Sequence, residues 1–168
     1  MSNSNSTLTL ERVQELLEYD VSAGNFRWLR TSRTMKAGVV AGSVERDGYV
    51  RISIDRTRYR AHRLAWLLQR GQWPSGEIDH INGQRADNRI INLRDVTTSV
   101  NIQNQRRALS NNASSGLLGV TRTQGQRRFR AKIQTPEGRL HLGYFDSPAE
   151  AHAAYLAAKR RLHQGCAI

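Results

Sequence analysis

The sequence predicts an α+β protein made of two modules, and three features lead to that prediction. Apolar residues recur at helical spacing in several segments and alternate with polar residues in others. A run of small polar residues over 108–114 interrupts both patterns and is typical of a linker. At 168 residues the chain is long enough for two small cores. We therefore expect one module over residues 1–107 and another over 115–168.

The first module is expected to begin with a helix and a small sheet. Apolar residues at helical spacing over 9–19 predict an amphipathic helix. Alternation over 26–29 and 49–54 predicts two short strands, separated by a glycine-rich loop, in a hairpin or small sheet. A second, buried helix is predicted over 59–70, and Gly71 ends it.

The segment 78–105 is rich in turn residues and is expected to form a hairpin followed by a helix. Asn82-Gly83 is a strong hairpin signal. A helix is predicted from Thr98 or Ser99 to about Arg107.

The second module is expected to be a three-stranded antiparallel sheet covered by one helix. Three short strands are predicted within 119–145, with turns at 124–125 and 136–138. In the middle strand, apolar residues alternate with Arg and Lys, so one face packs and the other is cationic. An alanine-rich helix is predicted over 148–163.

The chain is strongly basic, with 26 Lys and Arg, 14 Asp and Glu, and a net charge of +12. This excess favours polyanionic partners, above all nucleic acid, although a basic solvated surface is the alternative. Residues 77–105 are nearly neutral between two positive flanks, which suits a site for a divalent cation. Because Cys166 is the only cysteine, we expect no disulfide framework and no zinc site built on cysteine pairs.

Residues suited to phosphodiester hydrolysis gather between 79 and 104. A neutral histidine can take a proton from water, carboxylate and carboxamide oxygens can hold a hard cation, and a second amide can fix the imidazole. Taken alone, the Asp79-His80 pair favours a turn carboxylate bonded to a satisfied structural histidine, and only the full ordered pattern of residues favours the chemical role. The candidates for this chemistry are Asp79, His80, Asn92, Asn101 and Asn104.

The stretch IDHINGQRADNRIINLRDVTTSVNIQNQR resembles the HNH motif of phage and intron-homing endonucleases. The preceding YRAHRLAWLLQRGQWPSGE resembles what commonly precedes that motif. The resemblance implies a ββα-metal core in which a hairpin and a helix surround one divalent cation, Mg²⁺ or Mn²⁺. It implies that His80 is the general base, that Asp79 and Asn101 are the metal ligands, and that Asn92 orients the His80 ring. Asn101 stands where many relatives carry the last histidine of the motif.

Four further residues of the first module remain open at this stage. Asn104 is either a helix-surface amide or a supporting phosphate contact. His62 is expected to be structural, whereas Arg60 and Arg63 beside it could contact phosphate.

Residues 115–163 resemble the ethylene-response-factor type of DNA-binding domain, through the GV opening, the RFRAKI strand and the HLGYFDSPAEAHAAY run. In that family the sheet, not the helix, enters the major groove, which implies that the cationic strand face contacts DNA. Each basic residue alone is as compatible with a solvated surface as with a contact. The candidate contacts are Arg122, Arg128, Arg130, Lys132 and Arg139.

These observations predict a metal-dependent DNA endonuclease of the homing type, acting on double-stranded DNA as a monomer or homodimer and nicking one strand per site. The alternatives are a catalytically idle DNA-binding regulator and an RNA-processing nuclease. No apolar stretch approaches the roughly 18 residues of a membrane span, so we expect a cytoplasmic protein. The resemblance implies a phage-encoded protein acting in a bacterial host cell.

Overall fold

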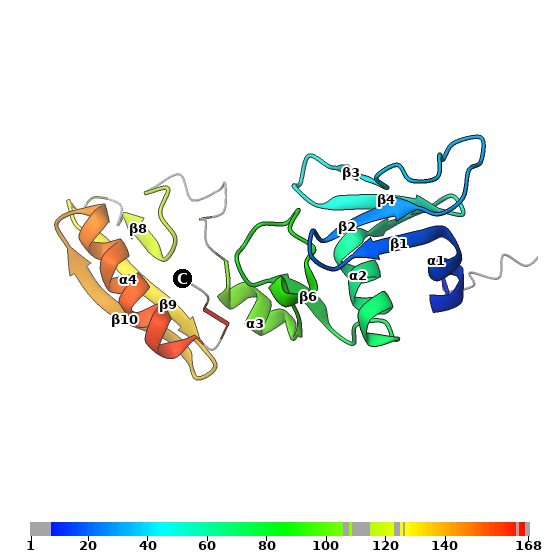
Figure 1. The fold of residues 1–168 in the computed structure, drawn as a ribbon. Helices are drawn as coiled ribbons and strands as arrows, with labels where there is room; N and C mark the ends of the chain where they lie inside the picture. Colours follow the sequence, from blue (N-terminus) through cyan, green and yellow to red (C-terminus); the bar gives the residue numbers. More distant parts are fainter. Residues whose placement is uncertain are drawn as a thin grey trace, which may run out of the picture. The chain divides into compact units, whose positions relative to one another are not determined.

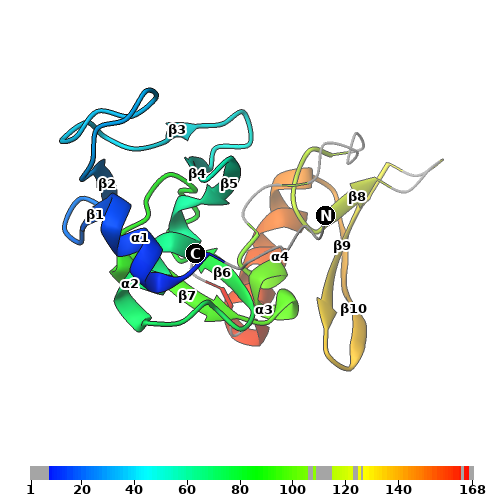
Figure 2. The same cartoon turned by 90° about the vertical axis from the view of Figure 1, so that its right-hand side faces the viewer.

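The computed structural model describes residues 8–105, 108, 115–122, 125, 127–163 and 165–166. The chain forms two compact units that divide between Val96 and Thr97. Both contain helices and small antiparallel sheets, which confirms the predicted α+β class (Figures 1 and 2). The predicted linker lies almost wholly outside the described residues.

The first unit opens with a helix that is shorter than predicted. Helix α1 spans Leu10–Leu16, and its first turn is capped by Thr9, whose hydroxyl accepts from the Arg12 N–H at 3.2 Å. The predicted continuation to residue 19 was wrong, because the chain becomes extended at Leu17 and forms strand β1, Leu17–Asp20. Burial alternates along β1, as in a strand with one packed face, and β1 pairs with β2, Asn25–Trp28.

A three-stranded sheet follows, with the order β3-β4-β5. Its strands are β3, Ser43–Val44, β4, Val50–Ile54, and β5, Thr57–Arg60. The predicted helix start at residue 59 was wrong, because the last two residues of β5 pair with β4 before helix α2, Ala61–Arg70, begins. The end at Gly71 is confirmed: this glycine has φ 74° and donates to the Leu67 carbonyl at 2.8 Å.

Strands β6, Glu77–His80, and β7, Leu93–Val96, form the last hairpin of this unit. Asn82-Gly83 forms a turn, but the two strands are joined by the whole segment 81–92, which ends in the short 3-10 helix η1, Ile90–Asn92. This segment will be called the hairpin loop. The core of the unit lies between α1, α2 and the strands, where the largest fully buried side chains are Val13, Phe26, Ile52, Ile54 and Leu64.

The second unit contains α3, Thr98–Gln103, and the predicted sheet with its helix. The helix predicted to reach Arg107 ends at Gln103, and residues 106 and 107 lie outside the described part. The strands are β8, Val120–Arg122, β9, Phe129–Thr135, and β10, Gly138–Phe145, in the order β10-β9-β8.

Helix α4, Pro148–Leu162, packs on this sheet, as predicted (Figure 1). It begins with a capping box in which Ser147 and Glu150 exchange side-chain and backbone hydrogen bonds. The small face of the helix and the apolar face of the sheet bury Val120, Ala131, Ile133, Ala151, Tyr155 and Ala158. No helix in the described part of the chain is both long and apolar enough to cross a membrane.

Candidate active site

Strand β6 ends in two adjacent polar residues that are both buried. Asp79 is 6% exposed and His80 is 4% exposed, and Ile78 before them is buried as well. Burying a carboxylate next to an imidazole is unfavourable unless both groups have partners. Burial of these two polar side chains therefore lowers the stability of the folded protein, which is typical of a functional site.

Asp79 has a charged partner on the facing strand. It lies opposite Arg94 in the β6–β7 register, and its Oδ2 accepts from Arg94 Nε at 2.8 Å and from a terminal nitrogen of the same guanidinium at 2.6 Å. The guanidinium therefore gives the buried carboxylate a hydrogen-bonded partner in a place where a lone carboxylate would be poorly solvated.

The His80 ring lies among two other rings. Its centroid is 5.0 Å from that of His62, with the planes nearly perpendicular, and 5.8 Å from that of Tyr49. Burial lowers the pKa of His80, and the nearby Arg85 lowers it further, while the Asn88 carboxamide and two carboxylates oppose the shift. The imidazole is therefore neutral near neutral pH, which is the form that can accept a proton.

His62 is a second buried histidine at this site. It is 3% exposed, and burial, with smaller contributions from His80, Arg60 and Arg63, lowers its pKa to about 3. Its Nδ1 is buried with no hydrogen-bond partner. A structural role was expected for His62, but its ring also contacts the ring of His80 directly.

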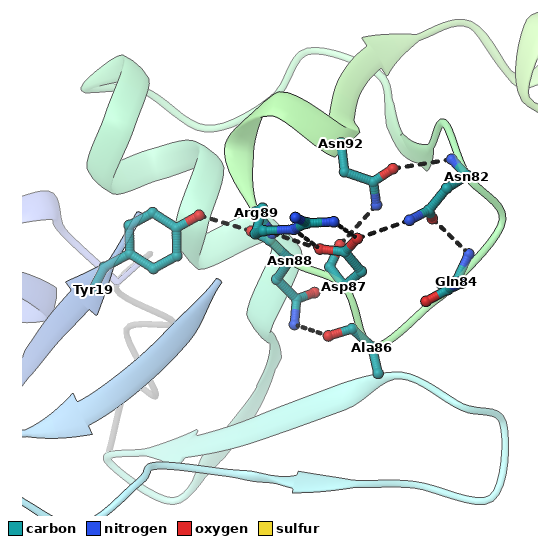
Figure 3. A network of polar contacts seen from close by, with 8 residues as sticks. All are labelled: Tyr19, Asn82, Gln84, Ala86, Asp87, Asn88, Arg89 and Asn92. Atoms are coloured by element: carbon teal, nitrogen blue, oxygen red, sulfur yellow. Dashed lines mark hydrogen bonds and ion pairs between the residues drawn. The ribbon is translucent and has the colours of Figure 1, made fainter. Parts of the chain in front are cut away.

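The hairpin loop is held by its own side chains (Figure 3). Asn92 Oδ1 accepts from the Asn82 backbone N–H at 2.9 Å, and Asn92 Nδ2 donates to the Asp87 carbonyl at 2.9 Å. The Asp87 carboxylate accepts from Asn82 Nδ2 at 2.7 Å and pairs with Arg89 at 2.6 Å. In this arrangement the Asn92 side chain fixes the shape of the loop that follows His80.

The first hairpin of the chain supports the same loop from outside. The Tyr19 hydroxyl, on β1, donates to the Asn88 carbonyl at 2.8 Å (Figure 3). Gly24, at the β1–β2 turn, approaches so closely that a Cβ there would lie 2.5 Å from the Arg89 nitrogen. Asn88 is 2% exposed, and its carboxamide donates to the Ala86 carbonyl at 3.1 Å.

The remaining residues predicted for the nuclease site have different surroundings. Arg63 donates to the Gly76 carbonyl at 3.4 Å, and its guanidinium lies over the Trp73 ring. Asn101 lies within α3, and Asn104 caps the end of that helix. Both belong to the second unit, so their predicted roles stay predictions.

The possible metal ligands of the first unit suit a magnesium site with few protein ligands better than a site built wholly from protein side chains. The described residues contain no group of three or more His, Cys, Asp or Glu that could hold a metal ion. Mg²⁺ commonly binds one or two carboxylates and completes its shell with water and substrate phosphate. A buried carboxylate that is itself held by a guanidinium, as Asp79 is by Arg94, fits that requirement.

The second unit presents cationic side chains on the outer face of its sheet. The side chains of Arg130, Lys132 and Arg139 line a depression together with His141 and Tyr144. Burial, then Arg139 and Arg130, lowers the pKa of Lys132, as expected where cations are crowded without counter-charge. Two further candidates have contacts of their own: Arg128 pairs with Asp146 at 3.0 Å, and Arg122 lies over the Phe129 ring.

Residues 59–103 match the family model described as HNH endonuclease. Searches of curated proteins and of solved structures gave no significant match. The matched segment contains the buried Asp79-His80 pair, His62 and the whole hairpin loop, and HNH nucleases generally use a divalent metal ion. Residues 59–103 therefore form an HNH endonuclease domain, which makes the protein a phosphodiester hydrolase with a nucleic-acid substrate.

Proposed function

We propose that the protein is a metal-dependent DNA endonuclease of the homing type that cuts one strand of duplex DNA per active site. The observation that carries this proposal is the buried Asp79-His80 pair inside the HNH segment, with an ion-paired carboxylate next to a neutral imidazole.

In this proposal His80 is the general base, which takes a proton from the water that attacks phosphorus. Its ring lies against the rings of His62 and Tyr49. Asn92 is a positioning residue that acts through the hairpin loop.

Asp79 and Asn101 would hold one divalent cation, Mg²⁺ or Mn²⁺. When bound, the cation stabilises negative charge on the phosphate and on the leaving oxygen. Arg94 would fix the direction of the Asp79 carboxylate through their ion pair.

The second unit supports DNA as the substrate. A cationic sheet face backed by a helix can lie in the major groove of B-form DNA, whereas the major groove of an RNA duplex is too deep and narrow for side chains to read. We propose that this sheet binds duplex DNA and selects the site, and that one nuclease site per chain nicks a single strand.

The substrate is tested by comparing labelled duplex DNA with RNA of the same sequence, each in Mg²⁺ and in chelator. We expect cleavage of DNA only, and only with the metal. Cleavage of RNA in preference to DNA would favour the RNA-processing alternative. Binding of DNA without cleavage in any divalent metal would favour the regulator.

The sheet assignment gives a prediction for the second unit. Arg130→Ala should weaken binding to the cognate site by about 1–3 kcal/mol if the side chain meets a base. Replacing Arg160 and Arg161 at the end of α4 should give a smaller loss that is similar on every sequence. Equilibrium binding to cognate and scrambled duplexes at matched salt decides this, and loss of discrimination in the helix variant alone would refute the assignment.

A further inference from the structure

Two arginines lie against one tyrosine ring beside the candidate base. The guanidinium carbon of Arg60 is 4.6 Å from the centroid of the Tyr49 ring, and that of Arg85 is 5.0 Å from the same centroid. The two residues come from different segments, since Arg60 ends β5 and Arg85 lies in the hairpin loop. They will be called the arginine pair.

Neither member of the pair is neutralised by a carboxylate. Both side chains are exposed, and no ion pair to either is present among the described residues. Arg85 donates instead to the Asp47 backbone carbonyl at 2.9 Å, which fixes its direction without removing its charge. Other arginines of this unit do pair with carboxylates, namely Arg12, Arg51, Arg58, Arg89 and Arg94.

The arrangement gains little stability by itself. Two like charges on one small ring repel each other, and a cation over an exposed aromatic ring gains only about 0.5–1 kcal/mol. Tyr49 also contacts both His62 and His80, so the arginine pair lies on the same ring that contacts the two buried histidines. Burial lowers the pKa of His80, and Arg85 makes a smaller contribution in the same direction.

We propose that Arg60 and Arg85 bind the phosphate backbone of the nucleic acid next to the bond that is cut. The Tyr49 ring, against which both guanidiniums pack, orients them. This inference rests on the proposed function and adds a substrate-binding site to it. A guanidinium offers a planar fork of donors that matches two phosphate oxygens, and it remains charged at any relevant pH. Two guanidiniums on the same tyrosine ring would hold the nucleic-acid strand so that the phosphate to be cut lies next to His80.

The test is equilibrium binding of the full chain to duplex DNA in chelator over a range of salt concentrations. Each phosphate contact on B-form DNA contributes about 0.9 to the slope of log affinity against log salt. Arg60→Gln and Arg85→Gln should each lower that slope by about one and weaken binding by about tenfold at low salt. Arg60→Lys and Arg85→Lys should keep the slope, because lysine also neutralises a phosphate.

Arg70→Gln is the matched control. Its guanidinium also lies over an aromatic ring, 5.3 Å from the centroid of Trp66, and it is also exposed. It follows His62 by eight helical residues, which places it about 12 Å further along α2. This variant should keep the wild-type slope. An unchanged slope in both glutamine variants of the pair, or an equal loss in Arg70→Gln, would overturn the proposal.

Cleavage by the wild-type chain in Mg²⁺ is measured beside binding, so that the two proposals fail separately. If the wild type cuts DNA and the pair variants keep their slope, the nuclease stands and the arginine pair does not bind phosphate. If the wild type does not cut but the pair variants lose slope, the phosphate site stands and the proposed activity is wrong.

Discussion

His80→Ala is expected to lower the rate of DNA cleavage by about 10²- to 10⁴-fold, the usual contribution of a positioned general base. DNA affinity should hardly change, because the imidazole is buried and contributes little to the protein surface that would contact the phosphate backbone of DNA. The rate is measured under single-turnover conditions with saturating enzyme, and the affinity in chelator.

A second histidine variant controls for the loss of any imidazole. His152 belongs to α4 in the second unit, where its Nδ1 lies 3.0 Å from the Leu118 carbonyl. His152→Gln should cut at the wild-type rate. The assignment of the base fails if His80→Ala cuts as fast as the wild type.

Acid should destabilise the first unit through His62. The native pKa is about 3, whereas an exposed histidine has a pKa near 6.5. The unfolded chain therefore binds a proton that the native chain excludes, so this contribution to stability is complete above pH 6.5 and declines as the pH falls toward 3. The loss from this one group between pH 7 and pH 4 should be about 3 kcal/mol.

His62→Leu isolates that effect from the titration of carboxylates. Leucine has a similar volume and removes the buried Nδ1 that has no hydrogen-bond partner. Urea unfolding is followed by tryptophan fluorescence, which reports only the first unit because all three tryptophans, Trp28, Trp66 and Trp73, lie there. The variant should lose less stability on acidification than the wild type. Identical pH profiles would mean that His62 titrates normally.

The candidate site could be predicted only where its residues are close together in the sequence. Asp79-His80 and Asn92 share one short motif, and the hairpin brings them to the same strand ends. Arg94 could have been found from the strand register, because it lies directly opposite Asp79. Tyr49 gave no local signal, since it lies just before β4 and contacts His80 at the end of β6, 31 residues later in the sequence.

The fold was predicted best where the apolar residues follow a single spacing, either that of a helix or that of a strand. The helix α4 has a Ser-Pro start and an unbroken small-residue face, and the structure confirms its bounds within one residue. The region 17–19 was predicted as the end of the first helix but forms strand β1. Pairing with β2 decided the outcome, and such pairing is a tertiary effect that local propensity does not contain.

Strand β5 was missed because the turn before it carries neither glycine nor asparagine. Its turn places Asp55 and Arg56 at positive φ, a conformation that glycine or asparagine usually announces in a sequence. Asp55 accepts two hydrogen bonds from Arg12 of α1, both at 2.9 Å, which helps to hold the turn in place.

The most direct test of the nuclease site is relaxation of supercoiled plasmid DNA by the purified full chain, with Mg²⁺ and chelator as the only difference. The account predicts that nicked circles accumulate before linear DNA, that chelator stops the reaction, and that Asp79→Ala needs more metal to reach a given rate. Cleavage that continues in chelator, or an Asp79→Ala variant with the wild-type metal dependence, would contradict it.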